Sequence, residues 1–442
     1  MNMERYAAYK DSGTGWLGDL PSHWELCRIS ALYCVRNEKV SDKNYAPLSV
    51  TMQGVVPQLE TAAKTQDGDN RKLVKSGDFV INSRSDRRGA CGISEMDGSV
   101  TLISNVLAPK DRRAMSARYY EYLFRSEGFA DEFYHQGTGI VDDLWTTNWS
   151  RMKNILVTHP SLTEQRAIAD YLDAKTAEID ALVADCEREV ALLREYRKAL
   201  ISEAVTKGLD PAAPMKDSGV EWIGKIPEGW DVIPLRRCIV RTGNGITRRG
   251  DYDEDGALVL KLRNINNGAI DYGFQNRMQL SDHELDSFKL DRGDFLFVRV
   301  NGSRDLVGKS AIFEGYPGDV AYNDHIIRIS FSDKYCIPRL MLWYLQSEAS
   351  RREIDLRVKT SAGQFTVSSD DIKECLFVMP PLQEQIEIAS FLDIKTTEID
   401  TIIEAKQSMI DKLREYHKSL VSEAVTGKFK VSSLAGAGRE AG

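Results

Sequence analysis

The stretch KDSGTGWLGDLPSHWEL at residues 10–26 returns as KDSGVEWIGKIPEGWDV at residues 216–232, with eight of 17 positions identical. A longer pair follows. Residues 160–206 align without a gap to residues 380–426, and 24 of 47 positions match, including LxEQ, LDxKTxEID and LREYxKxLxSEAVT. The segments between these anchors, 27–157 and 233–377, differ in length and mostly in sequence. The pattern indicates a tandem duplication with a fixed frame and diverged inserts. Equal frames predict one kind of partner engaged twice, and unlike inserts predict two different targets.

The size and composition of the chain exclude several classes of protein. At 442 residues it exceeds what one hydrophobic core usually serves, so several domains are expected. With 42% hydrophobic and 28% charged residues, no apolar run long enough to span a bilayer and no secretory signal, we expect a cytoplasmic protein without membrane contact. Seven cysteines without a CxxC pair and six scattered histidines predict neither a disulfide framework nor a metal site.

The net charge of −8 hides an uneven distribution. Residues 27–157 carry 18 Lys and Arg against 16 Asp and Glu, and residues 233–377 carry 21 against 21. Arginine dominates these cations, with 11 of 18 in the first insert and 15 of 21 in the second. Its planar donor fork suits phosphates and guanine edges. The alternative is that a near-neutral domain simply carries surface arginines.

Two long helices are predicted in the frame. Residues 163–206 lack proline and glycine and are rich in helix formers, with Gly208 and Pro211 as stop signals, and the second copy runs from about Gln383 to Gly427. Apolar positions spaced mostly by seven predict a coiled-coil pair. A pseudo-two-fold axis is the simplest arrangement of the tandem repeat, and such an axis perpendicular to the helices makes them antiparallel. A rod of this length, roughly 65 Å at ~1.5 Å per residue, would hold one insert domain at each end. The packing positions are Leu172, Ile179, Cys186, Leu193 and Leu200, with Leu392, Ile399, Leu413 and Leu420, while Lys406 interrupts the second stripe. Further apolar residues are expected to widen the two stripes: Ile168, Leu182, Val183, Val190 and Tyr196 in the first, and Ile402, Ile403, Met409, Ile410 and Tyr416 in the second.

The frame repeats polar and aromatic positions as well as its apolar stripe. A rod that only spaces two domains needs the stripe alone, so the repeated surface residues predict a shared partner surface. The candidates are Trp16, Trp24, Trp222, Trp230, Glu164, Gln165, Glu384 and Gln385. The competing interpretation is a plain spacer or dimerisation rod.

The inserts share faint landmarks, such as SGDFVI at 76–81 and RGDFLF at 292–297. Alternating apolar runs predict short strands, and each insert is therefore expected to be a small α/β or α+β domain. Arginine, asparagine and glycine cluster in the predicted loops, where they could contact phosphates and base edges. The candidates for DNA binding are Arg84, Arg87, Arg88, Arg248, Arg249, Arg263, Asn264, Arg299, Asn301, Arg304, Lys309 and Gln364.

No catalytic constellation stands out. SRDLVGKS at 303–310 lacks the first glycine of a Walker A loop, and we interpret it as a strand and turn of the insert. No methyltransferase tetrapeptide, GxSxG elbow or nuclease motif is convincing. The chain is expected to be non-catalytic, with no catalytic residues and no cofactor of its own.

The repeated KDSGxxWxGxxPxxW segment and the PLxEQxxIAxxLDxKTxEID … LREYxKxLxSEAVT helices together resemble the DNA-specificity subunit of type I restriction–modification enzymes, over residues 10–429. That resemblance implies that each insert is a target recognition domain reading half of a bipartite, asymmetric site on double-stranded DNA. It also implies two methyltransferase subunits, which would hold S-adenosylmethionine, and ATP-driven restriction (translocase) subunits that join through them.

The domain boundaries expected from this resemblance follow the repeats. They are 1–157 for the first target recognition domain with repeat segment 10–26, 158–209 for the central helix, 210–377 for the second domain with repeat segment 216–232, 378–429 for the C-terminal helix, and 430–442 for a disordered tail. Two alternatives stay open: a duplicated scaffold whose inserts recognise protein, and an enzyme that uses the GKS loop to bind a nucleotide.

Overall fold

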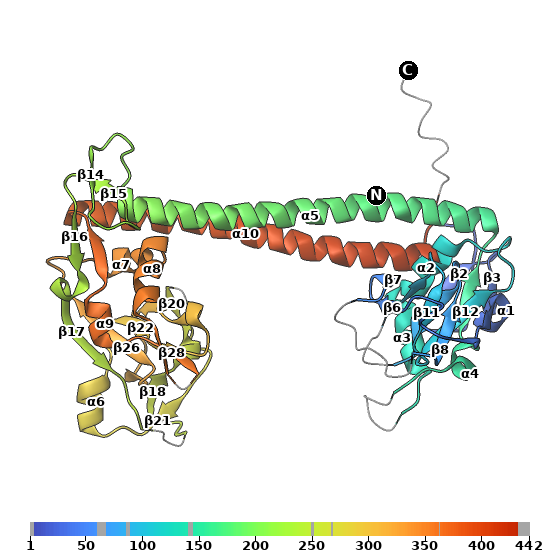
Figure 1. Ribbon diagram of the computed structural model, residues 1–442, viewed down its shortest axis with the longest axis horizontal. Helices are drawn as coiled ribbons and strands as arrows, with labels where there is room; N and C mark the ends of the chain where they lie inside the picture. Colours follow the sequence, from blue (N-terminus) through green and yellow to red (C-terminus); the bar gives the residue numbers. More distant parts are fainter. Residues whose placement is uncertain are drawn as a thin grey trace. The chain divides into compact units, whose positions relative to one another are not determined.

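The computed structural model describes residues 4–59, 68–84, 89–139, 145–248, 252–266, 268–361 and 363–431 (Figure 1). The chain divides into two compact units. The first combines Met1–Glu187 with Gln407–Gly442, and the second is the continuous stretch Arg188–Lys406. Arg87, Arg88 and Arg249 lie outside the described residues, as does most of the predicted tail.

The first unit is a mixed α and β domain joined to parts of both long helices. Its elements in chain order are β1 (Tyr9–Asp11), β2 (Asp19–Pro21), β3 (Glu25–Arg28), α1 (Ile29–Leu32), β4 (Tyr33–Val35), β5 (Lys39–Val40), β6 (Leu48–Thr51), β7 (Gly54–Pro57), β8 (Arg71–Val74), β9 (Phe79–Asn82), β10 (Cys91–Ile93), β11 (Gly98–Val100), β12 (Ser104–Pro109), α2 (Ala117–Arg125), α3 (Glu127–His135), α4 (Trp149–Met152), β13 (Leu156–His159) and the beginning of α5 (Leu162–Lys207).

The second unit has the same kind of composition. Its elements are β14 (Met215–Asp217), β15 (Lys225–Pro227), β16 (Asp231–Pro234), η3 (Leu235–Arg237), β17 (Ile239–Asn244), β18 (Ala257–Leu260), η4 (Leu262–Asn264), β19 (Ile265–Asn266), β20 (Ala269–Ile270), β21 (Arg277–Met278), α6 (Asp282–Phe288), β22 (Phe295–Val298), β23 (Val300–Asn301), η5 (Arg304–Leu306), β24 (Ser310–Ile312), β25 (Val320–Tyr322), β26 (Ile326–Phe331), α7 (Pro338–Tyr344), α8 (Glu348–Arg357), β27 (Lys359–Ser361), β28 (Gln364–Thr366), α9 (Ser369–Lys373), β29 (Leu376–Met379) and the beginning of α10 (Leu382–Val425).

The two inserts share one four-stranded sheet in spite of their diverged sequences, although their smaller sheets differ. The first contains an antiparallel sheet in the order β10-β9-β12-β4, and the second contains the matching order β24-β22-β26-β17. The frame strands also match, since β3 pairs with β13 as β16 pairs with β29, and β1 with β2 as β14 with β15. The SGDFVI and RGDFLF landmarks fall on β9 and β22, where Phe79 and Phe295 are fully buried. The two landmarks therefore mark equivalent strands of the two inserts.

The cores of the inserts continue into the long helices. In the first unit Phe79, Phe124 and Phe129 pack in one cluster with Leu172 of α5 and Leu420 of α10. The second unit has an equivalent cluster built around Phe295 and Phe297, which includes residues of both long helices. Each reader is thus anchored on a helix pair by continuous apolar packing, which fixes its orientation on the helices that carry it.

The long helices run antiparallel within each unit. In the first, Arg414 Nη2 lies 2.7 Å from Glu187 Oε1, and His417 lies 3.9 Å from Asp180. In the second, Arg197 Nε lies 2.9 Å from Asp400 Oδ1, and Lys406 pairs with Glu189. Lys406 does interrupt the apolar stripe, and the ion pair compensates its charge. The predicted fold class, two α/β insert domains with a pair of long antiparallel helices, is confirmed.

The predicted packing stripe is too wide. Most of the heptad positions are buried, but Leu193, Leu200 and Leu413 are only half-buried. Positions that would widen the stripe are solvent-exposed on the described chain, because each helix meets one partner helix and an amphipathic face of this width is only partly used. They are Leu182, Tyr196, Ile402, Met409 and Tyr416.

Glycine ends both long helices in a left-handed conformation, as the sequence predicts. Gly208 has φ +81° and Gly427 has φ +69°. Beyond Gly427, Lys430 donates its backbone N–H to Glu4 O at 2.7 Å, and Val431 packs against the first core. The segment predicted to be disordered from residue 430 is therefore attached to the first unit through residue 431.

Candidate nucleic-acid interface and partner surfaces

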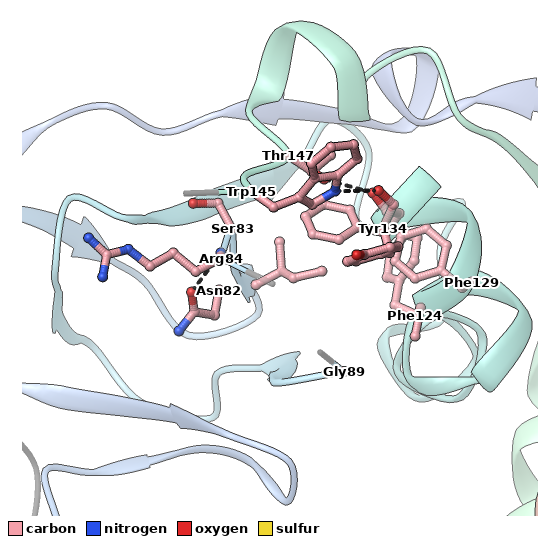
Figure 2. Close-up of a pocket in the computed structure, with 12 residues that line it drawn as sticks. Asn82, Ser83, Arg84, Gly89, Phe124, Phe129, Tyr134, Trp145 and Thr147 are labelled. Carbon is pink, nitrogen blue, oxygen red and sulfur yellow. Dashed lines mark hydrogen bonds between the residues drawn. The ribbon is translucent and has the colours of Figure 1, made fainter. Parts of the chain in front are cut away.

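In the first insert one predicted DNA-binding residue, Arg84, is described by the structure. It follows β9, it is exposed, and its backbone N–H donates to Asn82 Oδ1 at 3.0 Å. Figure 2 shows its guanidinium extending away from the ring of Trp145 and toward open space. An exposed guanidinium at a strand end that is held by a hydrogen bond can donate to a phosphate or to a base edge.

An aromatic cluster supports the strand end that carries Arg84 (Figure 2). Trp145 Nε1 donates to Tyr134 O at 2.9 Å, and the two rings stack with centroids 5.6 Å apart. Together with Phe124, Phe129 and neighbouring residues they line a cavity of about 20 Å³. That volume holds about one water molecule, so this is no pocket for an extruded base. The cluster therefore serves to position the strand end.

In the second insert Arg263 is exposed and has no ion-pair partner among the described residues. Its guanidinium carbon lies 4.8 Å from the centroid of the Phe274 ring, and both side chains reach solvent. Such stacking orders a long cationic side chain and leaves its N–H groups free for a ligand. Gln364 on β28 is also exposed, and Lys309 is half-buried.

Two further arginines of the second insert are exposed but ion-paired. Arg248 Nε lies 3.1 Å from Glu284 Oε1, and Arg304 Nε lies 3.2 Å from Asp355 Oδ1. The hydrogen bonds from Arg248 hold the pKa of Glu284 at about 2, with help from the Ser281 backbone N–H. These arginines would have to share or exchange their carboxylates to contact DNA.

Three other candidates have structural roles within the second insert. The side chain of Asn264 is 1% exposed, and it bonds to Asp271 O at 2.8 Å and to Phe274 O at 2.9 Å. Half-buried Arg299 donates to Val367 O and Asp324 O, and Asn301 Oδ1 accepts from Ser303 N. Asn264 as a base reader is therefore wrong for this conformation, because its amide is used inside the fold. Polar residues beside glycine in sequence are as often turn-forming as ligand-binding.

The glutamate of LxEQ fastens the frame segment of each unit. Trp24 Nε1 donates to Glu164 Oε1 at 3.1 Å, and Trp230 Nε1 donates to Glu384 Oε2 at 2.9 Å. Both indoles are 1% exposed. Burial opposes ionisation of Glu164, yet hydrogen bonds from His23, Ser161 and Trp24 lower its pKa below the usual range.

The glutamine of LxEQ fastens the insert. Gln165 is fully buried, its Oε1 accepts from Ser116 N at 2.8 Å, and its Nε2 donates to Pro160 O at 2.9 Å. Gln385 does the same with Ile337 N at 3.0 Å and Pro380 O at 2.9 Å. As partner-binding residues, the glutamines and the buried tryptophans were predicted wrongly, because their polar atoms are used within the chain. These residues recur because the same internal contacts between frame and insert are made in both units.

A second anchoring residue was not assigned a role from sequence. Asp173 accepts from Tyr122 Oη at 2.8 Å and pairs with Arg118, while Asp393 accepts from Trp343 Nε1 at 2.8 Å and from Arg339 Nε at 2.8 Å. The repetition of LDxKT was the available signal, but nothing in one sequence names the partner across the fold.

What remains for a partner is the uncovered part of the frame. Trp16 and Trp222 are half-buried, but the indole N–H of each is a buried atom without an acceptor in the described chain, so a partner could meet only the exposed part of each ring. Apolar side chains on the long helices also face solvent, including Leu192 at 58% and Ile394 at 59% exposure. Exposed apolar positions repeated along a helix are typical of protein interfaces.

Searches of the described residues find no helix long and apolar enough to cross a bilayer and no cluster of three or more His, Cys, Asp or Glu side chains arranged for a metal. SRDLVGKS comprises the 3-10 turn η5 and the first residue of β24, so the turn precedes the strand here, whereas the sequence interpretation has a strand and then a turn.

Comparisons with known proteins agree with the frame motifs. Residues 263–411 match the family model described as type I restriction modification DNA specificity domain. The StySPI specificity subunit of Salmonella potsdam is 27% identical over 61% of this chain and 56% of its own length. The EcoKI specificity subunit of Escherichia coli (strain K12) is 25% identical over the same shares. The alignments therefore span little more than half of either relative.

Solved structures give the same fold at low identity. A chain from a study of complex assembly and conformational transition of the type I R-M system superposes with a TM-score of 0.70 at 14% identity, covering 93% of this chain and 99% of that one. The HsdS subunit from Thermoanaerobacter tengcongensis gives 0.54 at 16%, covering 95% and 100%. The resemblance to DNA-specificity subunits of type I restriction–modification enzymes is confirmed, and residues 263–411 are the part that matches the model of their specificity domain.

Proposed function

We propose that this chain is the non-catalytic DNA-specificity subunit of a type I restriction–modification complex. In this proposal its two inserts each read one half of a bipartite, asymmetric site. The main supporting observation is that the contacts joining the frame to each insert are the same in both units, whereas the inserts themselves differ. The Glu–Trp, Gln and Asp anchors recur in both units with the same sheet order, whereas the surface loops differ in sequence and in which arginines they expose.

In each reader, exposed arginines supply affinity through phosphates and a smaller number of base contacts supply the preference. Arg84 in the first insert and Arg263 in the second are the foremost of these residues, since both are exposed and neither is ion-paired within the described chain. Each wrong base pair then costs about 1–3 kcal/mol, which is enough to direct a complex to its site.

The partners in this proposal are two methyltransferase subunits and, through them, restriction subunits. S-adenosylmethionine and ATP belong to those partners. The exposed apolar residues of α5 and α10 support protein docking on the frame.

Methylome sequencing tests the proposal directly. DNA from cells that express the chain with its candidate methyltransferase subunit should show a new bipartite N6-methyladenine motif, absent when the chain is omitted. Exchange of residues 27–157 for another insert should alter one half-site only. A change in both half-sites would contradict two independent readers, and no motif despite an assembled complex would contradict the DNA role.

The scaffold alternative has one observation in its favour. Asn264 and Arg299 are used inside the second insert, and Arg248 and Arg304 are ion-paired, so fewer candidates are free for DNA than the sequence predicts. An assembled complex that binds random and cognate duplexes equally would favour this alternative.

A further inference from the structure

The second unit contains a cavity of about 390 Å³ where α5 ends and the β14–β15 hairpin begins. Figure 1 shows that hairpin beside the end of α5 and the start of α10. The lining includes apolar surface from Pro214, Pro227 and Ile388, the rim of Trp230, and the carboxylates of Glu384 and Glu387. A cavity of this size is within the range that takes a ligand group.

The equivalent place in the first unit is occupied by the chain itself. The Tyr6 ring lies 5.9 Å from the Trp24 ring and 5.4 Å from the His23 ring. His23 Nε2 lies 2.8 Å from Glu164 Oε1, and Ser161 Oγ donates to Glu164 Oε2 at 2.9 Å. The frame carboxylate therefore has the His23 ring against it, and the Tyr6 ring covers that histidine and Trp24.

The two units can be compared residue by residue because a frame hydrogen bond fixes the register. Ser22 N donates to Ala8 O in the first unit, and Glu228 N donates to Pro214 O in the second. By this register Tyr6 corresponds to Ala212, and His23 to Gly229. The helix alignment likewise places Pro381 where Ser161 stands. The two groups besides the tryptophan that bond the first carboxylate, His23 and Ser161, and the Tyr6 ring packed against His23 and Trp24, are thus missing from the second unit.

Without counterparts of His23 and Ser161, the Glu384 carboxylate can accept further hydrogen bonds from a ligand. Within the described chain Glu384 accepts a hydrogen bond from Trp230 alone. Glu387, Glu228 and Asp210 add negative charge to the lining, and its one cation, Lys207, already lies 3.5 Å from Glu203. A cation beside an apolar ring complements such a surface.

We propose that this cavity is a docking pocket for a partner protein, and that it takes an aromatic side chain flanked by a basic one. The first unit supplies the pattern of the occupant in its own Tyr6 and His23. The inference goes beyond DNA reading, because it concerns one frame junction and makes the two junctions unequal: one is closed by the chain and the other is open to a partner.

The test uses the full chain and a blocked dipeptide, acetyl-Lys-Tyr-amide, with stoichiometry measured by equilibrium dialysis and contact by saturation-transfer NMR. We expect one site on the natural chain and none on the double variant Ala212→Tyr with Gly229→His, since a Cβ at Gly229 meets open space. The matched variant Tyr6→Ala with His23→Gly opens the first junction and should bind two dipeptides.

Charge and ligand class are checked with two further probes. Acetyl-Glu-Tyr-amide should bind at least tenfold more weakly, because it places a carboxylate against Glu384. Equal binding of the two dipeptides, or equal binding to the filled variant, would overturn the proposal. Tighter binding of tyramine than of the dipeptide would also overturn it, in favour of a small-molecule site. None of these measurements involves DNA or methylation, so this inference and the proposed function can fail separately.

Discussion

Trp24 donates its indole N–H to Glu164 across 140 residues of sequence, at 3.1 Å, and Trp230 makes the same bond to Glu384 across 154 residues, at 2.9 Å. Each bond joins the frame segment that precedes an insert to the helix that follows it. The joint closes the insert at its base, which explains how the loops above it can vary while the frame is retained.

Removing one bond of this joint should loosen one unit only. Trp24→Phe keeps most of the ring but leaves the partly buried Glu164 without its indole donor, and a hydrogen bond to a charged group is worth roughly 1.5–3 kcal/mol. We expect faster amide exchange in β3, β13 and the start of α5, measured by mass spectrometry. Trp230→Phe is the matched variant and should affect β16 and β29 instead. Uniform loosening of both units by either variant would contradict the joint's local role.

The depressed pKa of Glu164 predicts an acid-sensitive first unit. A carboxyl whose folded pKa lies below its unfolded value of about 4.3 binds fewer protons when folded, so stability rises with pH through that window. The contribution is present above the unfolded value and is lost as pH falls through the folded one. In the Glu164→Gln variant, the free energy of unfolding should fall less steeply below about pH 4.5 than in the natural chain. Amide exchange or circular dichroism measured over a pH series checks this. An unchanged acid profile would contradict it.

The glycine that ends α10 should tolerate no side chain. Gly427 has φ +69°, and an added Cβ would lie 2.5 Å from Pro21 Cδ and 3.0 Å from Trp24 Cη2. Gly427→Ala should therefore cost more than the roughly 1–2 kcal/mol of left-handed strain alone. Gly219→Ala is the control, since Gly219 has φ +75° with open space around its Cβ. Thermal unfolding of the two variants should rank Gly427→Ala as the less stable, and equal midpoints would refute the steric contribution.

Arg263 should contribute to DNA affinity more than its ion-paired neighbour Arg304. Arg263→Ala removes an exposed guanidinium stacked on Phe274, whereas Arg304 is already held by Asp355. If Arg263 contacts a phosphate, binding of the assembled complex weakens for all sequences and the salt slope falls by about 1; a base contact relaxes one position of the motif instead. Fluorescence anisotropy over a salt series separates these results. No change in affinity or preference would remove Arg263 from the interface.

An exposed apolar position on the helix pair should be needed for assembly. Leu192 is 58% exposed, so Leu192→Asp should leave the fold intact while it places a charge in any apolar interface that covers this face. We expect at least a tenfold loss of affinity for the methyltransferase subunit, measured by native mass spectrometry. Ala191→Asp is the matched control: it adds the same charge at the neighbouring exposed position but removes no large apolar side chain, so it should weaken assembly less than Leu192→Asp does. Unaltered assembly with Leu192→Asp would exclude this face.

Much of the fold could be predicted from local sequence patterns. Helix formers without glycine or proline gave α5 and α10 within a few residues, and alternating apolar runs located β9, β12, β22 and β26. These are properties of neighbouring residues, so one sequence can reveal them. The width of the packing stripe was overestimated, because Leu182 and Tyr196 have apolar side chains at suitable spacing but no partner helix beside them.

The candidate site was less accessible to sequence reasoning. Gln165 lies in the repeated LxEQ motif and Asn264 in a segment rich in Arg and Asn, yet both are buried and hydrogen-bonded within the chain. Repetition shows that a residue is needed twice, but not whether its partner lies within the fold or outside it. Likewise, Tyr6 and His23 attracted no attention, because their role depends on a carboxylate more than 140 residues away.

The division of the chain also sets an order of events during synthesis. Residues 188–406 can close their core as soon as they leave the ribosome, because both halves of their helix pair are present. The first unit must wait, since Leu420, Val421, Ala424 and Val425 complete its core. At ~5–20 residues per second, translation of the intervening roughly 200 residues takes on the order of 10–40 s. The domain made first is thus finished last, and its exposed core during that interval is where chaperones would be required.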